Sequence, residues 1–130
     1  MNVLATIASR RGLVSSLLAV AAACARPASA VETVQMPMQA HRGYFSEHCF
    51  VLSQGQRLAY EVHTPHAVDF NLHHHPAEGG TVFPDRLRLA ARHANEIVAE
   101  SGGVYCFQAA NPEDRGQGYV LTVSYDVSGG

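Results

Sequence analysis

The sequence predicts an all-β domain, an antiparallel β-sandwich of about seven or eight short strands. Apolar and polar residues alternate in the segments 68–76 and 119–127, which is typical of strands that bury one face. Turn residues rich in glycine and proline separate several further short apolar segments. Their spacing is that of a sandwich, in which many short strands follow one another along the chain.

The first expected strands are short. Residues 31–40 alternate weakly and contain a proline, so the lead-in 31–46 holds either an edge strand or an irregular segment. The sandwich itself is expected over residues 47–128. It begins with a strand at 49–52, which ends in a Ser-Gln-Gly turn, and continues with a half-buried strand at 56–63.

The segment 68–76 carries the most chemistry. Its apolar face consists of Val68, Phe70 and Leu72, and its polar face of Asp69, Asn71, His73 and His75. By the same alternation His74 faces inward near the end of the strand. One face therefore supplies the scaffold, and the other is a candidate site.

Residues 85–100 fit two structures. Their apolar residues follow a helical period, and the local pattern favours a helix, although a strand at 95–99 also fits. The remaining segments are clearer. Alternate apolar residues predict a strand at 104–109, and the polar turn 111–118 leads into the final strand, 119–127.

Residues 1–30 have the features of a secretory signal peptide. Arg10 and Arg11 precede the apolar run 12–23, and small residues at 28–30 form a cleavage site. A membrane anchor is disfavoured, because the apolar run is shorter than the roughly 20 residues that span a bilayer. The letters SRRGLV at 9–14 also fit a twin-arginine export motif, and an ordinary signal fits equally well.

Composition narrows the function of the exported part, residues 31–130. It keeps six Arg, no Lys and eleven acidic residues, a formal charge of −5, and it holds all eight histidines. An acidic domain without a basic run is a poor candidate for binding nucleic acid or an anionic membrane. We expect a periplasmic or secreted protein without stable membrane insertion after cleavage.

Cleavage leaves two cysteines, Cys49 and Cys106, because Cys24 belongs to the signal. In an exported domain such a pair indicates a disulfide, which would contribute about 4 kcal/mol and which we expect to pin two sheets together. Two alternatives are a metal site with two thiolates and a redox pair. The first needs two further ligands nearby, and the second usually shows a CxxC spacing, which is absent here.

An ordered set of short motifs resembles the GOLD (Golgi dynamics) domain of lumenal cargo adaptors. The motifs are CF at 49–50, GQ at 55–56, YEV at 60–62, VDFNL at 68–72 and GGVYCF at 102–107, followed by the alternating last strand. That family has a Cys-Phe strand, a "VDF-I" strand and a "G-Y--CF-N" strand whose Cys pairs with the first, and Asn111 lies close to the position of its last Asn.

The resemblance implies a GOLD-like or jelly-roll-like β-sandwich with a Cys49–Cys106 bridge that contacts partners and does not catalyse. It also implies strands within 85–100, at least near Ile97, and we adopt this over the local helical pattern. The trafficking role of the adaptors does not carry over, because no coiled coil, membrane span or cytoplasmic tail is expected here.

The strongest candidate for a metal site is the pair His73 and His75. Two positions apart on a strand, their side chains leave one face about 7 Å apart. Both imidazoles then reach one ion, and imidazole suits zinc or copper. A solvated polar face without a ligand fits the pair slightly better. We consider five candidate ligands in all, His73, His75, His48, Met36 and Met38, because His48 could approach across a sheet and thioethers favour copper(I).

No catalytic motif is present, since no serine stands in a GxSxG context and there is no phosphate-binding loop. The sequence therefore predicts a non-catalytic binding or interaction domain of the bacterial envelope. Its partner is an unknown envelope protein or ligand. The second hypothesis is a periplasmic protein that binds copper or zinc through the HxH motif.

Overall fold

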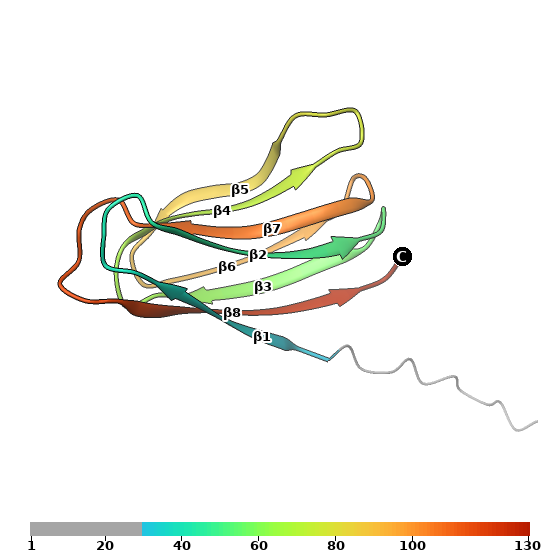
Figure 1. Ribbon diagram of the computed structural model, residues 1–130. Coiled ribbons are helices and arrows are strands. Elements are labelled where there is room, and N and C mark those ends of the chain that lie inside the picture. The colour runs from blue at the N-terminus through green and yellow to red at the C-terminus, as the bar shows by residue number, and fades with distance from the viewer. Residues whose placement is uncertain (1–29) are drawn as a thin grey trace, which may run out of the picture.

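The computed structural model describes residues 30–130 and confirms the all-β prediction (Figure 1). The predicted export signal lies almost wholly outside the described residues. Within 30–130 there is no helix long and apolar enough to cross a membrane. The eight strands are β1 (Glu32–Met38), β2 (Phe45–Leu52), β3 (Arg57–His63), β4 (Val68–His75), β5 (Val82–Leu89), β6 (Arg92–Val98), β7 (Gly103–Ala110) and β8 (Tyr119–Ser128).

The strands form two four-stranded sheets, in the orders β1-β8-β3-β6 and β2-β7-β4-β5. Every neighbouring pair is antiparallel, and the sheets lie as two layers (Figure 1). Among consecutive strands only β4 and β5 share a sheet, so nearly every connection crosses between the layers. Strand β1, in the predicted lead-in, lies at the edge of its sheet.

An apolar core fills the space between the sheets. The alternation in 68–76 and 119–127 assigns its residues correctly, since Val68, Phe70 and Leu72 are buried from β4, and Leu121, Val123 and Tyr125 from β8. Phe107 of β7 lies at the centre. Its ring centroid is between 5.0 and 6.2 Å from those of Phe50, Tyr60, Phe70 and Tyr125.

The local helical pattern at 85–100 was misleading, because these residues form β5 and β6. In β5 the inward Leu87 and Leu89 alternate with the exposed Arg86 and Arg88, and the strand pairs with β4. The helical spacing arose because β5 and β6 follow each other across a turn that contains two alanines. Ile97 faces Leu58 of β3, which confirms the strand implied near it.

The Cys49–Cys106 disulfide is present, but it does not pin two sheets together. The two residues face each other on β2 and β7, neighbouring strands of one sheet. Their side chains alternate with the inward Phe50 and Phe107, so the bridge lies on the outer surface of that sheet. The bridge therefore fixes one strand pair and its register.

A polar network joins the two sheets beside the β5 edge. The Asp85 carboxylate of β5 accepts hydrogen bonds from Tyr60 of β3 and, at 2.6 and 3.0 Å, from His93 and Asn95 of β6. Burial opposes ionisation of Asp85, but these hydrogen bonds outweigh it and hold the pKa of the carboxyl below its usual value. Burial, together with this carboxylate, raises the pKa of Tyr60.

A β-bulge interrupts β5 near its start. Leu72 of β4 pairs with Asp85, whereas His74 pairs with Val82, so β5 has one extra residue in between. Strict alternation would turn Phe83 inward together with Asp85. The bulge instead places it on the outer surface, where its ring centroid lies 6.0 Å from that of His73.

Candidate functional site

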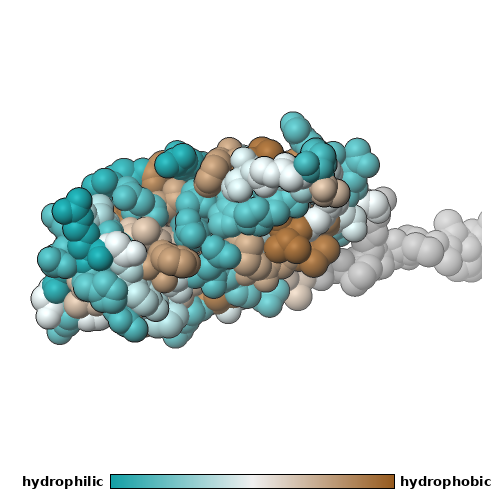
Figure 2. All heavy atoms as spheres, turned by 45° about the horizontal axis from the view of Figure 1, so that its top comes forward, coloured by the Kyte–Doolittle hydropathy of each residue, from teal (hydrophilic) through white to brown (hydrophobic). Residues whose placement is uncertain are grey.

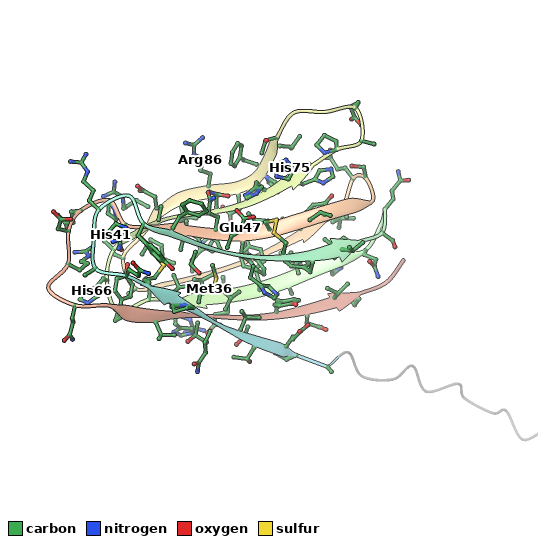
Figure 3. The ribbon with its side chains drawn as sticks, in the orientation of Figure 1. Met36, His41, Glu47, His66, His75 and Arg86 are labelled. Carbon is green, nitrogen blue, oxygen red and sulfur yellow. A yellow bond between two sulfur atoms is a disulfide. The ribbon has the colours of Figure 1, made fainter. Side chains whose placement is uncertain are left out.

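The outer face of the β2-β7-β4-β5 sheet, which we call the disulfide face, carries the candidate site. Register places nine side chains in three rows across β2, β7 and β4. The rows are Glu47-Gln108-Asn71, Cys49-Cys106-His73 and Val51-Val104-His75. Figure 3 shows Glu47 and His75 on this sheet, with Arg86 of β5 beyond them. Polar, sulfur-bearing and apolar groups thus lie in neighbouring rows.

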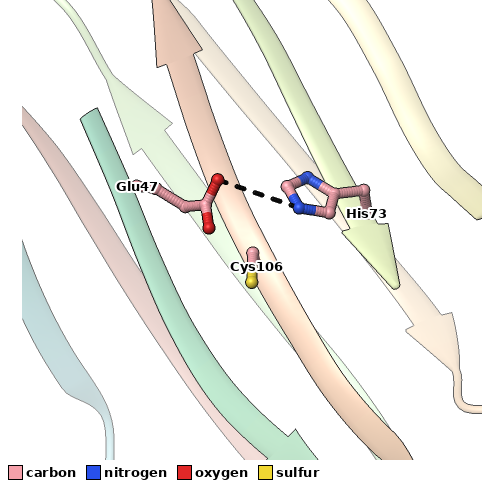
Figure 4. A group of neighbouring side chains, drawn as sticks. All are labelled: Glu47, His73 and Cys106. Carbon is pink, nitrogen blue, oxygen red and sulfur yellow. Dashed lines mark ion pairs between the residues drawn. The ribbon is translucent and has the colours of Figure 1, made fainter. Parts of the chain in front are cut away.

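Four side chains form a closed polar ring, which consists of Glu47, Asn71, His73 and Gln108. His73 donates through Nδ1 to Asn71 Oδ1 at 2.8 Å, and Asn71 donates to Gln108 at 3.0 Å. Gln108 in turn donates to Glu47 Oε2 at 3.2 Å. The ring closes where Glu47 Oε2 lies 3.8 Å from His73 Nε2 (Figure 4).

The polar ring leaves His73 with one free ligand atom. Because Nδ1 carries the proton donated to Asn71, the lone pair of the neutral imidazole is on Nε2, the nitrogen that faces Glu47. His73 is 6% exposed. Burial lowers the pKa of His73, and the nearby Glu47 carboxylate only partly offsets this effect. The imidazole is therefore neutral at pH 7 and able to bind a metal ion.

His75 is the exposed neighbour of His73, with ring centroids 5.0 Å apart. Together with Glu47, His73, Thr81, Phe83 and Gln108 it lines a shallow hollow of about 300 Å³. The loop after β4 supplies Thr81, and the bulge in β5 supplies Phe83. The hollow thus has two imidazoles and a carboxylate on its walls.

The structure does not bring the other predicted ligands into this hollow. Met36 and Met38 belong to the opposite sheet and are buried in the core. Figure 3 labels Met36. His48 points inward from β2, where its Nε2 lies 3.3 Å from the hydroxyl of Tyr125. Successive side chains of a strand point to opposite faces. His48 lies between the outward Glu47 and Cys49 and therefore points inward.

Sequence reasoning missed Glu47, the carboxylate that the fold brings to His73. The available signal was its position two residues before Cys49, which puts both side chains on one face of a strand. That signal becomes useful only once β2, β7 and β4 are known to be neighbours.

His74 forms a separate polar contact on the inner side of its own sheet, with β7 and the loop before it. Its ring stacks on Tyr105 at a centroid distance of 4.3 Å. Its Nδ1 donates to the Val104 carbonyl at 3.3 Å, and Ser101 donates to its Nε2 at 2.8 Å. A Cβ on Gly103 would lie 3.2 Å from the imidazole, so the glycine leaves room for the stack. Both nitrogens are satisfied, as is usual for a buried histidine.

Comparison with known proteins supports the fold and assigns no family. No protein-family model and no curated protein matches the sequence, so the GOLD resemblance is not confirmed. Among solved structures, PliG of Aeromonas hydrophila, a periplasmic inhibitor of g-type lysozyme, matches with a TM-score of 0.58 at 11% identity. The match covers 78% of this chain and 89% of PliG.

A second similar structure is the Yersinia pseudotuberculosis-derived mitogen. It matches with a TM-score of 0.48 at 15% identity, over 77% of this chain and 86% of the mitogen. The match to PliG alone shows the fold, a β-sandwich similar to that of PliG.

Proposed function

We propose that this chain is an exported, non-catalytic binding domain of the bacterial envelope that contacts a protein partner through the disulfide face. The observation that carries the proposal is exposed apolar surface beside the polar ring. Val51 and Val104 are 72% and 43% exposed and face each other across β2 and β7. Phe83, 44% exposed, lies on the far side of His73. Exposed apolar side chains that gather on one face of a sheet in this way are typical of interaction sites.

The view in Figure 2, which turns the side with β4 and β5 forward, supports this proposal. It shows a compact group of apolar side chains right of centre among hydrophilic ones, and smaller apolar spots elsewhere. On the outer face of the other sheet Val98 and Val120 are separated, because they lie at opposite ends of their strands, and Val31 is the third exposed valine of that face.

Charge and fold indicate which partner to test first. The charge of −5 on residues 31–130 favours a basic protein surface. PliG, which has a similar fold, is described as a lysozyme inhibitor. A g-type lysozyme is therefore the first probe, and affinity capture from envelope extracts is the second.

We expect Val51→Asp to weaken partner binding by about tenfold or more, because it places a charge in the centre of a desolvated apolar contact. Binding is measured by titration calorimetry with lysozyme, or by quantitative capture. Val120→Asp is the matched control, since it makes the same change at an exposed valine on the outer face of the opposite sheet and should leave binding unchanged. Equal binding by the wild type and Val51→Asp would refute the assignment to this face.

A second candidate function, binding of copper or zinc, is favoured by the pair Glu47 and His73. Two ligands of a tetrahedral zinc ion, with bonds near 2.0–2.2 Å, lie about 3.4 Å apart. The distance of 3.8 Å between Glu47 Oε2 and His73 Nε2 is close to this value. The hydrogen bond from His73 Nδ1 to Asn71 orients the ring, as the second ring nitrogen of a metal-bound histidine usually requires. His75 is the nearest further imidazole.

We expect the oxidised protein to bind Zn(II) or Cu(II) with a 1:1 stoichiometry, and His73→Ala to weaken this binding by at least about tenfold. His63→Ala is the matched control, because His63 also contacts a carboxylate, that of Glu61, but lies on the other sheet without a neighbouring histidine. Calorimetric titration with each metal ion measures the affinity. Equal affinities in the two variants would eliminate this candidate.

A further inference from the structure

A third potential ligand lies beside Glu47 and His73, and it is a disulfide sulfur. One carboxylate oxygen of Glu47, one ring nitrogen of His73 and Cys106 Sγ all lie within 4.8 Å of one another (Figure 4). Cys106 and His73 are register partners on β7 and β4. While the bridge is closed, this sulfur is bonded to Cys49 and cannot serve as a thiolate ligand.

The two sulfurs of the bridge differ in environment. Cys49, on the edge strand β2, is exposed, whereas Cys106 is 2% exposed. An external thiolate can therefore reach Cys49 Sγ more easily than Cys106 Sγ, and thiol exchange depends on such access. Attack at Cys49 releases Cys106 as the leaving group, next to His73 and Glu47.

We propose that reduction of the Cys49–Cys106 bridge turns the disulfide face into a zinc site formed by Cys106, His73 and Glu47. The reductant is a dithiol. Its first thiolate attacks Cys49 Sγ, the S–S bond breaks, and the electron pair leaves on Cys106 Sγ. The second thiol of the reductant, as its thiolate, then displaces Cys49, so that one dithiol is oxidised to its disulfide and two protein thiols form. Zinc binds Cys106 as its thiolate, and the proton of the Cys106 thiol is lost to solvent.

The row geometry fits such a site. Directly opposed residues on antiparallel strands have Cβ atoms about 4.5–5.5 Å apart, so Cys49, Cys106 and His73 lie side by side across three strands. Once the S–S bond is broken, Cys106 Sγ is free to turn toward His73 Nε2. Cysteine, histidine and carboxylate are the three ligand types that zinc binds in proteins, and a water completes the tetrahedron.

The inference does not depend on the protein-binding proposal. It shares Glu47 and His73 with the second candidate function and adds a thiolate to them. The two metal hypotheses therefore make different predictions about how zinc affinity depends on the redox state of the bridge. A site made of imidazole and carboxylate binds equally well in both states, whereas a site that needs Cys106 binds tightly only after the bridge is opened.

The decisive comparison uses Cys49→Ser and Cys106→Ser, two variants that lose the same bridge and so share its cost in stability. Cys49→Ser leaves a free thiol beside His73 without any reductant. We expect it to bind one Zn(II) per chain and to give a cobalt–thiolate charge-transfer band when Co(II) is substituted. We expect Cys106→Ser to bind at least about tenfold more weakly and to lack the band.

The wild type supplies the second measurement, which needs no variant to fold. Reduced with a non-coordinating phosphine, it should gain the cobalt–thiolate band, and the oxidised protein should lack it. Adding His73→Ala to Cys49→Ser should weaken zinc binding by at least about tenfold. The proposal is overturned if reduced wild type shows no band, or if Cys106→Ser binds as tightly as Cys49→Ser. Equal zinc affinity of oxidised and reduced wild type would also overturn it, while supporting the imidazole–carboxylate site.

Discussion

Replacing both cysteines by alanine (Cys49→Ala with Cys106→Ala) should lower the free energy of unfolding by about 4 kcal/mol. The bridge joins positions separated by 57 residues, so it restricts the unfolded chain over half the domain. It also fixes the register between β2 and β7, and through β7 the rows of the disulfide face. Urea unfolding in the presence of a chelator measures the change.

Reductant provides the internal control for this prediction. It should destabilise the wild type by about the same amount and leave the double variant unchanged, because both then lack the same covalent constraint. A chelator is needed, since zinc bound to the reduced protein would restore part of the lost stability. A loss below about 1 kcal/mol in the double variant would mean that strand pairing alone, without the bridge, holds β2 in place.

Asp85→Ala should cost about 3 kcal/mol, the second largest effect that we predict. The substitution leaves the hydroxyl of Tyr60 and the donors of His93 and Asn95 without their shared acceptor. Tyr60 is 4% exposed, so water cannot easily replace the carboxylate there. Glu96→Ala is the matched control, because it removes a carboxylate from an exposed ion pair with Arg57 and should change stability by less than about 1 kcal/mol.

The stability that Asp85 contributes should depend on pH in one direction. The pKa of this carboxyl is lower in the folded protein than its ordinary value, so its contribution is fully present above the pKa of the unfolded state. The contribution is lost as the pH falls through the folded pKa. The stability difference between wild type and Asp85→Ala should therefore be constant near neutral pH and shrink in acid. A difference that grows on acidification would contradict the network.

The fold could be predicted from the sequence where alternation was long and uninterrupted. β4 and β8 each turn one face into the core, and their inward and outward residues were assigned correctly, although the outward His73 is also buried. The failure at 85–100 has a local cause, since two strands joined by a short turn with alanines can mimic a helical period. Tertiary pairing with β3 and β4 decides the outcome there, and local pattern does not contain that information.

The candidate site could be predicted only within one strand. Spacing placed His73 and His75 on one face, as the structure shows, because that relation is local. The partner residue Glu47 came from register between β2, β7 and β4, which the sequence does not state. The outward position of Phe83 could not be predicted from alternation, because a bulge reverses the direction of its side chain.

The three-row arrangement has an evolutionary consequence. Along β2, β7 and β4, odd and even positions serve opposite sides of the same layer, so mutations at Glu47, Val51 or Val104 leave the residues packed in the interior untouched. The outer surface can then acquire a new binding specificity at little thermodynamic cost, while the interior continues to select the same architecture. A scaffold of this kind is free to diversify in function far more quickly than in shape.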